Sequence, residues 1–429
     1  MLDAPKGLRL SIGIYGRRNA GKSSLLNALT GQAAAIVSET PGTTADPVEK
    51  TLEMAPLGPV VFIDTAGVDD SGDLGELRKA RTFQTMDRAD LAILACAEAG
   101  WGEYEDALAA MLDERGVPFL AVFNKADAVE ADPERMRALR LSLRPAVAAS
   151  ALHGQGMEAI REALVRLAPK DWFAPPRLLG DLLSAGDLAV LIVPIDLGAP
   201  KGRLILPQVQ AIRDVLDSDA YCVTVKEREL REAYARMNRP PALAVCDSQV
   251  VLKAAADTPP DVPLTTFSIL MARFKGDLPV LARGAAAIET LSPGDRVLIA
   301  EGCSHHPLAD DIGRVKIPRW LRQYAGGAIV TEICAGKDFP EDLSPYRLVI
   351  HCGACTLNRA NMLARMYRAQ SQDVPITNYG VAISFLQGVL PRTLASFPAA
   401  LAAFETAFRR AAETKDAAPA YGAEAGRMA

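Results

Sequence analysis

The sequence predicts an α/β protein made of three successive units, each a parallel sheet with helices on its faces. Two observations support this fold class. Apolar runs of strand length alternate with helical stretches along nearly the whole chain, which is typical of βα units that pair into parallel sheets. Two proline-rich segments, 168–177 (APKDWFAPPR) and 257–263 (DTPPDVP), interrupt this alternation as linkers do. The expected units are residues 1–171, 178–263 and 264–412, followed by a disordered tail at 413–429 that is small and polar.

In the first unit, a strand is expected at 8–16 (LRLSIGIYG), with a helix from Gly21 onward. Four more apolar runs are strand candidates: 60–67 (VVFIDTAG), 91–96 (LAILAC), 119–125 (FLAVFNK) and 146–150 (AVAAS). Helical stretches such as 103–116 (EYEDALAAMLDERG) separate the later runs. This order of elements predicts a sheet that is covered by helices on both faces.

The second and third units show the same alternation. In the second unit the expected strands are 188–195 (LAVLIVPI), 221–225 (YCVTV) and 242–246 (ALAVC). Helices are expected near 206–217, from Lys226 and from Ser248. In the third unit the strand candidates are 296–302 (RVLIAEG), 328–333 (AIVTEI), 346–353 (YRLVIHCG) and 374–380 (VPITNYG).

Composition limits the classes of function. The chain has 429 residues, of which 49% are hydrophobic, enough to form cores in two to four domains. Its net charge of −5 argues against broad nucleic-acid binding, because a surface that follows phosphates is usually basic. The first residues lack a secretory pattern, and no apolar run approaches the ~20 residues that span a bilayer. We expect a cytoplasmic protein with no membrane or nucleic-acid partner.

A phosphate-binding loop is predicted at 16–23, where GRRNAGKS matches G-x-x-x-x-G-K-[ST] between a strand and a helix. The glycines Gly16 and Gly21 let backbone N–H groups close around phosphates, Lys22 reaches the β and γ oxygens, and Ser23 binds Mg²⁺. The alternative, an ordinary glycine turn, does not explain why a strand precedes the loop and a helix follows it. Ala20 and Ser24 complete the expected phosphate contacts.

Three further motifs follow in order, each just after a strand. DTAG at 64–67 supplies Asp64 near the metal and Gly67 near the γ-phosphate. NKAD at 124–127, with Asn124, Lys125 and Asp127, offers a carboxylate that can accept two hydrogen bonds from a guanine edge. SAL at 150–152 would place a backbone N–H of Ser150 or Ala151 near the guanine carbonyl. Because adenine lacks that donor pair, the expected nucleotide is GTP, with hydrolysis to GDP and phosphate.

These motifs, spread over about 170 residues, resemble those of the translation-factor-related GTPases. The resemblance is strongest to the branch that has PGTT in switch I, a sequence found here at 41–44. The resemblance implies that Thr44 joins Ser23 and Asp64 at Mg²⁺. No glutamine follows DTAG to orient the attacking water as in Ras-type enzymes. Some relatives without it hold K⁺ through a P-loop asparagine, and Asn19 matches that position, so K⁺ would be a cofactor. A plain turn residue is the alternative at Asn19.

Two short stretches concentrate the metal-binding side chains. CSHH at 303–306 and HCGAC at 351–355 hold three of the four histidines and three of the seven cysteines. Both follow predicted strands, and the carboxyl ends of parallel strands converge on the ligand-binding edge of a sheet. We therefore expect the two stretches to meet. Thiolates suit either a Cys3His zinc site or an iron–sulfur cluster, and the pattern alone leaves both open. Cys96, Cys222, Cys246 and Cys334 lie in apolar runs and are expected in the core.

A GTPase motif set, a middle α/β unit and C-x-H followed far downstream by H-C-x-x-C resemble the HydF family of [FeFe]-hydrogenase maturation GTPases in domain order over essentially the whole chain. The resemblance implies a [4Fe-4S] cluster on Cys303, Cys352 and Cys355, and dimerisation through 178–263. It also implies a scaffold role, in which a diiron precursor made with radical-SAM maturases is assembled and delivered to the [FeFe]-hydrogenase apoprotein. The fourth iron ligand would be weak, with His351 or His305 as candidates and His306 as a lesser one.

Two other functions remain open at this stage. One is a GTPase with a zinc-bearing RNA- or ribosome-binding domain, which the lack of a strongly basic C-terminal unit disfavours. The other is a GTP-dependent enzyme that does redox chemistry on the cluster, which the lack of C-x-x-x-C-x-x-C disfavours.

Overall fold

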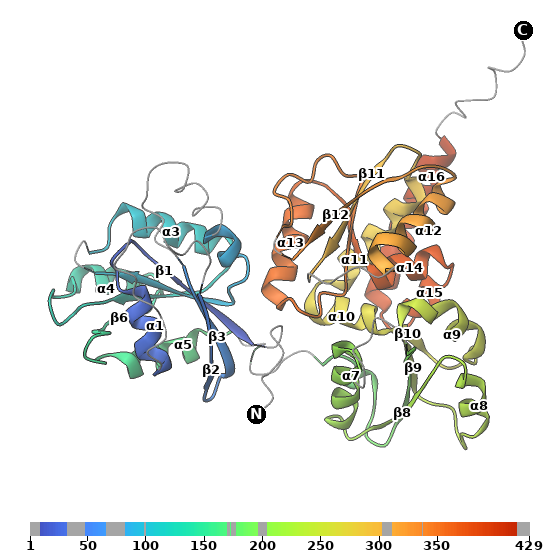
Figure 1. Cartoon of the computed structure of the whole chain (residues 1–429), viewed down its shortest axis with the longest axis horizontal. Helices are drawn as coiled ribbons and strands as arrows, with labels where there is room; N and C mark the ends of the chain where they lie inside the picture. The colour runs from blue at the N-terminus through green and yellow to red at the C-terminus, as the bar shows by residue number, and fades with distance from the viewer. Residues whose placement is uncertain are drawn as a thin grey trace, which may run out of the picture. The chain divides into compact units, whose positions relative to one another are not determined.

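The structure is a computed structural model, and it describes residues 9–31, 48–65, 82–97, 100–169, 172, 177–195, 204–302, 311–336 and 338–417. The chain divides into two compact units, Met1–Pro175 and Pro176–Ala429. Figure 1 shows the helices and strands of each unit.

The first unit contains a six-stranded sheet in the order β2-β3-β1-β4-β5-β6. Its strands are β1 (Leu10–Tyr15), β2 (Val48–Met54), β3 (Gly58–Asp64), β4 (Leu91–Cys96), β5 (Phe119–Phe123) and β6 (Ala146–Ala148). All neighbours are parallel except β2, which pairs antiparallel with β3. The five expected strands are confirmed. Strand β2 was not expected, because its sequence VEKTLEM is mostly polar and contains neither an apolar run nor a strict alternation.

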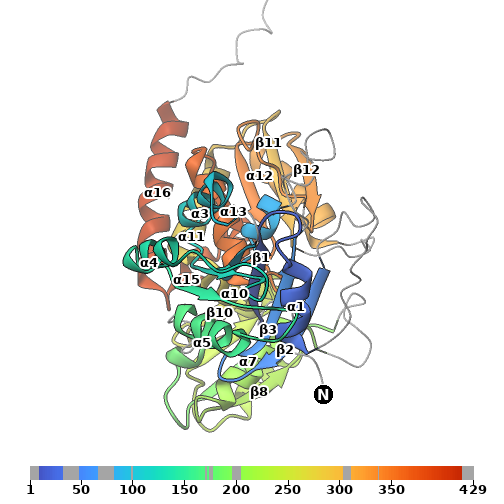
Figure 2. The ribbon, with the colours of Figure 1, turned by 90° about the vertical axis from the view of Figure 1, so that its left-hand side faces the viewer.

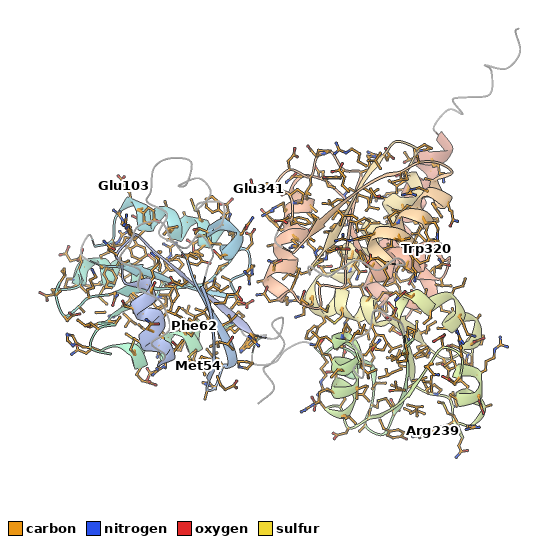
Figure 3. All side chains as sticks on the ribbon, in the orientation of Figure 1. Met54, Phe62, Glu103, Arg239, Trp320 and Glu341 are labelled. Carbon is orange, nitrogen blue, oxygen red and sulfur yellow. The ribbon has the colours of Figure 1, made fainter. Side chains whose placement is uncertain are left out.

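Helices cover both faces of this sheet, as predicted. They are α1 (Lys22–Thr30), α3 (Glu103–Glu114), α4 (Pro133–Leu141) and α5 (Met157–Leu167). Helices α1 and α5 pack over one face, where Phe62, labelled in Figure 3, is fully buried. On the other face α3 packs against β4 and α4 against β6. Both faces of the strands are therefore apolar, as parallel sheets require.

The second unit contains two four-stranded sheets, ordered β10-β9-β7-β8 and β12-β11-β13-β14, and every pair is parallel. The first has β7 (Leu188–Ile192), β8 (Tyr221–Val225), β9 (Leu243–Cys246) and β10 (Leu264–Thr266). The second has β11 (Arg296–Glu301), β12 (Val330–Ala335), β13 (Leu348–His351) and β14 (Ile376–Asn378). All seven strands expected here are confirmed. Strand β10 is an eighth that sequence reasoning missed, because it directly follows the proline-rich segment 257–263 that was expected to be a linker.

The helices of the second unit are α7 (Leu206–Leu216), α8 (Leu230–Ala235), α9 (Val251–Asp257), α10 (Phe267–Lys275), α11 (Leu278–Ala285), α12 (Ile317–Ala325), α13 (Arg359–Ser371), α14 (Tyr379–Leu386), α15 (Leu390–Leu394) and α16 (Pro398–Ala417). Short turns of helix at Gly180–Leu182, Ser248–Val250, Ala286–Thr290 and Ile312–Lys316 complete the unit. Helix α16, which Figure 2 shows along its length, packs against α11. The expectation of disorder from 413 is wrong for 413–417, which are the last residues of α16.

The two sheets of the second unit have the same strand order when one is read from the opposite edge. Their last strands also continue alike in sequence: DVPLTTFSILMARFKGDLP at 261–279 and DVPITNYGVAISFLQGVLP at 373–391. Two helices follow each of these strands, and the second helix of each pair packs on the other sheet: α11 packs on β14, and α15 packs on β10. One hydrophobic core therefore includes both sheets. The expected boundary at 263/264 falls within the first sheet, because β10 follows it, and both sheets lie in the one compact unit Pro176–Ala429.

Within the described parts of the chain, no helix is both long enough and apolar enough to cross a bilayer.

Candidate functional site

The loop between β1 and α1 has the backbone geometry of a phosphate cradle. Gly16 and Gly21 have φ of +144° and +81°. A Cβ at Gly16 would lie 2.1 Å from the carbonyl oxygen of Ala95, and one at Gly21 would lie 2.2 Å from Asn124 Nδ2. The buried Lys22 Nζ donates to the carbonyls of Gly16 (2.9 Å) and Arg17 (2.8 Å). The lysine charge is therefore held at the centre of the loop, where the motif places phosphate oxygens.

The expected magnesium ligands meet beside this loop. Ser23 Oγ donates to Asp64 Oδ2 at 2.6 Å. Burial raises the pKa of Asp64, against smaller opposite effects of Ser23 and Lys22. The other carboxylate oxygen, Oδ1, is buried and has no hydrogen-bond partner among the described residues. A hydroxyl and an unsatisfied carboxylate oxygen suit a hard cation such as Mg²⁺, so these residues fit the ion.

The guanine motifs are joined to the phosphate loop through one buried side chain. Asn124 Nδ2 donates to the carbonyl of Ala20 (3.0 Å), and Asn124 Oδ1 accepts from the N–H of Ala151 (3.1 Å). Lys125 follows with φ of +59°, and Ser150 is fully buried. The phosphate loop, NKAD and SAL, which were predicted to bind one nucleotide, therefore lie together.

The carboxylate expected to recognise guanine is held by Ser150. The hydrogen bond from Ser150 is the main reason why the pKa of Asp127 lies below its ordinary value. His153 Nε2 lies 3.8 Å from Asp127 Oδ2. Asp127 is thus an ionised acceptor at neutral pH, as pairing with a guanine edge requires.

The remaining predicted residues fall in two groups. Asn19 and Ser24 are exposed on the phosphate loop and the start of α1, and Asn19 has φ of +63°. Thr44 and Gly67 lie outside the described residues, so their expected roles at Mg²⁺ and the γ-phosphate stay predictions.

One contact at this site was missed from the sequence. Arg17, a variable position of the phosphate loop, forms two hydrogen bonds with the fully buried Glu105 of α3 (2.9 and 3.2 Å). Glu105 also accepts from the N–H of Gly102 (3.0 Å), and the Arg17 guanidinium lies over the Tyr104 ring. The only sequence signal was a glutamate three residues after Gly102, the residue that directly precedes α3. The pair ties the phosphate loop to α3.

Gly302, at the carboxyl end of β11, lies beside Cys352, which follows β13. Cys352 Sγ accepts from the N–H of Gly302 (3.0 Å) and of Ala354 (3.4 Å). A Cβ at Gly302 would lie 3.3 Å from this sulfur, and Thr356 Oγ1 donates to the Gly302 carbonyl (3.2 Å). Gly302 directly precedes Cys303, but residues 303–306 lie outside the described residues, so the meeting of the two stretches stays a prediction.

His351, one candidate for the fourth iron ligand, has protein partners at both ring nitrogens, and its expected role stays a prediction. It is fully buried on β13. Its Nε2 lies 2.9 Å from Arg365 Nη1, and its Nδ1 lies 2.9 Å from the Cys352 carbonyl. Burial lowers the pKa of His351 to about 3. Sequence spacing did not reveal this, because Arg365 comes from a helix whose packing decides which way the ring faces.

The other cysteines agree in part with expectation. Cys96, Cys246 and Cys334 are buried, whereas Cys222 is half-buried on the edge strand β8. Cys355 is half-buried, and Cys303, His305 and His306 lie outside the described residues. Within those residues no three metal-binding side chains form a group. The two backbone donors at Cys352 Sγ fit a metal-bound thiolate, which accepts hydrogen bonds that a buried neutral thiol does not need.

Comparisons with known families match all three parts of the chain. Residues 11–125 match the 50S ribosome-binding GTPase family. Residues 178–276 match the hydrogen maturase F dimerization domain, and 279–396 match the hydrogen maturase F tetramerization domain.

Curated relatives are similar in the first unit. The tRNA modification GTPase MnmE of Synechococcus sp. (strain JA-3-3Ab) is 42% identical over 162 residues, which are 37% of this chain and 34% of that protein. The GTPase Der of Kosmotoga olearia is 34% identical over 192 residues, 41% of this chain and 42% of that protein. The chain thus spans less than half the length of these relatives.

Solved structures are also similar over part of the chain. A variant of Aquifex aeolicus Era bound to GDP·AlF4⁻ covers 50% of this chain and 92% of its own, at 19% identity and a TM-score of 0.34. The G domain of the T. maritima FeoB iron transporter covers 38% of this chain and 99% of its own, at 26% identity and a TM-score of 0.30.

Proposed function

The chain belongs to the hydrogen maturase F family, and from that premise we propose that it is a GTP-hydrolysing scaffold for maturation of [FeFe]-hydrogenase. It holds a [4Fe-4S] cluster and assembles and delivers the diiron precursor of the hydrogenase active site. The observation that carries the proposal is the approach of Gly302, next to Cys303, to the Cys352 sulfur, in a chain that also holds a guanine-nucleotide site.

The GTPase site supports hydrolysis with Mg²⁺ as cofactor. Lys22 binds the β and γ oxygens and neutralises charge that develops on the transferring phosphoryl group. Ser23 and Asp64, with Thr44, hold Mg²⁺, which supplies further positive charge to the same oxygens. Gly67 donates its backbone N–H to the γ-phosphate. Asn19 lies at the position that would bind K⁺, and K⁺ there would stimulate hydrolysis without an arginine finger.

The cysteine site supports cluster binding through Cys303, Cys352 and Cys355. When bound, the cluster supplies one-electron redox capacity and an iron whose fourth ligand can exchange. The backbone N–H groups of Gly302 and Ala354 stabilise the thiolate of Cys352. With His351 occupied by Arg365, the exchangeable ligand comes from His305, His306 or an external molecule. Such an exchangeable position lets a cargo attach and leave without loss of the cluster.

We assign oligomerisation to the second unit, with a homodimer through 178–276. The supporting feature is the edge strand β8, where Tyr221 and Val223 are 46% and 39% exposed. An edge strand with exposed apolar side chains offers unpaired backbone groups to a second copy. The other partners of the proposed function are the [FeFe]-hydrogenase apoprotein and the radical-SAM maturases, and the compartment is the cytoplasm.

Anaerobic reconstitution with iron and sulfide, followed by electron paramagnetic resonance of the dithionite-reduced protein, tests the proposal. We expect about four irons per chain and a cluster signal that disappears in Cys303→Ala, Cys352→Ala and Cys355→Ala. Cys334→Ala is the matched control, because this cysteine is buried on the same sheet, and it should keep the signal. A protein that binds zinc and stays silent would instead support the zinc-bearing RNA- or ribosome-binding alternative.

A further inference from the structure

A buried arginine lies beside the cysteine site. Arg365 of α13 is 6% exposed, and it is the only buried arginine among the residues that the structure describes. Its guanidinium donates to the Gly336 carbonyl after β12 and lies 5.0 Å from the centre of the Phe339 ring. Burying a guanidinium is costly unless its hydrogen bonds are made, so the site is built to hold a positive charge.

Arginine also fixes the tautomer of His351. A guanidinium can only donate, so His351 Nε2 accepts from Arg365 Nη1 at 2.9 Å. The ring proton is then on Nδ1, which donates to the Cys352 carbonyl at 2.9 Å. Arg365 therefore orients, through one imidazole, the peptide that follows the Cys352 thiol.

Arg365 lies near two thiols. Its partner His351 directly precedes Cys352 in the chain, and Cys334 lies on β12 of the same sheet. The sheet register explains this proximity, because Cys334 and His351 flank the same residue, Ala300, on neighbouring strands.

The other sheet of the same unit provides an internal comparison. Strand β9 is the counterpart of β13 in that sheet. Cys246 of β9 is at the position equivalent to His351, and it pairs with Ile192 and Thr266 on the neighbouring strands. Cys246 is fully buried, and within the described residues no arginine is buried around that sheet. A sheet of this topology therefore does not need a buried arginine at this position. Among the described residues, the buried arginine is found only beside the sheet that carries the cysteine stretches.

We propose that Arg365 is a positioning residue for the cysteine site, which holds the Cys352 peptide through His351 and places a permanent positive charge beside the thiolates. This inference rests on the proposed cluster. Reduction adds an electron, so a nearby positive charge stabilises the reduced state more than the oxidised state. Arg365 thereby raises the reduction potential of the cluster.

The test is a redox titration of the reconstituted full chain, monitored by electron paramagnetic resonance, with iron content measured on the same samples. Arg365→Met should retain iron but give about a tenfold lower ratio of reduced to oxidised cluster at a fixed potential, which is about 59 mV for a one-electron couple. Arg365→Lys, which keeps the charge, should lower the ratio of reduced to oxidised cluster by less than Arg365→Met does. The matched control is Arg392→Met, since Arg392 of α15 also donates to backbone carbonyls, those of Ala255, Thr258 and Pro259, beside the sheet without the cysteine stretches.

Full iron content with an unchanged midpoint in Arg365→Met would overturn this inference and leave the proposed function intact. Failure of the unmodified protein to take up iron would overturn both. If the methionine variant does not fold by circular dichroism, Arg365→Gln removes the charge but keeps a hydrogen-bond donor. A midpoint for that variant equal to that of the unmodified protein would equally refute the role of the charge.

Discussion

Replacement of Gly21 by alanine tests whether Asn124 couples the guanine motifs to the phosphate loop. Gly21 has φ of +81°, and an added Cβ would lie 2.2 Å from Asn124 Nδ2. Because that atom ends a flexible side chain, Asn124 should move rather than the backbone. It would then lose its hydrogen bonds with Ala20 (3.0 Å) and Ala151 (3.1 Å).

The magnitude follows from these two bonds. Each hydrogen bond contributes about 0.5–1.5 kcal/mol. Loss of both should therefore weaken the binding free energy of GDP by about 1–3 kcal/mol, because the guanine site is no longer held in place. At 1.4 kcal/mol per tenfold change, GDP should bind about 5–150-fold more weakly. A fluorescent GDP analogue titrated by equilibrium fluorescence measures this directly.

Gly31→Ala is the matched control. Gly31 also has a left-handed backbone, with φ of +64°, but no atom lies within 4 Å of an added Cβ. Backbone strain should lower the free energy of unfolding of this variant by roughly 1–2 kcal/mol, and its affinity for GDP should be unchanged. If Gly21→Ala bound GDP as tightly as Gly31→Ala does, the coupling through Asn124 would be refuted.

Three more predictions concern the two sites. Lys22→Ala should abolish GTP hydrolysis and leave the cluster spectrum intact, while Cys352→Ala should do the reverse; loss of the cluster in the lysine variant would contradict separate sites. GTP hydrolysis should be faster in potassium than in sodium chloride, and Asn19→Ala should remove most of the difference; equal initial rates in both salts would exclude the ion. Because the Ser150 hydrogen bond lowers the pKa of Asp127, guanine binding should persist above that lowered pKa and fail as pH falls through it. Ser150→Ala should therefore shift this acid limit of GDP binding to higher pH, and an unshifted limit would show that another group controls it.

Much of the nucleotide site was determined by the sequence, because its parts are local. Gly16, Gly21 and Lys22 need only a strand before them and a helix after them to form a phosphate cradle, and apolar runs of strand length predicted every strand except β2 and β10. The meeting of Gly302 and Cys352 could also be predicted, since parallel strands end at one edge of a sheet.

The environment of each side chain was decided only by the tertiary structure. A histidine next to two cysteines is a plausible ligand by spacing, but His351 is fully buried and hydrogen-bonded to Arg365, 14 residues later in the chain. Likewise, the proline-rich segment 257–263 does not end the first sheet, because β10 follows it. The two sheets share one core because α11 packs on β14 and α15 packs on β10. Periodicity along a chain determines which residues are apolar and in which element they lie. Which element packs against which, and so which group faces a thiol or an imidazole, depends on contacts between distant segments that no local pattern contains.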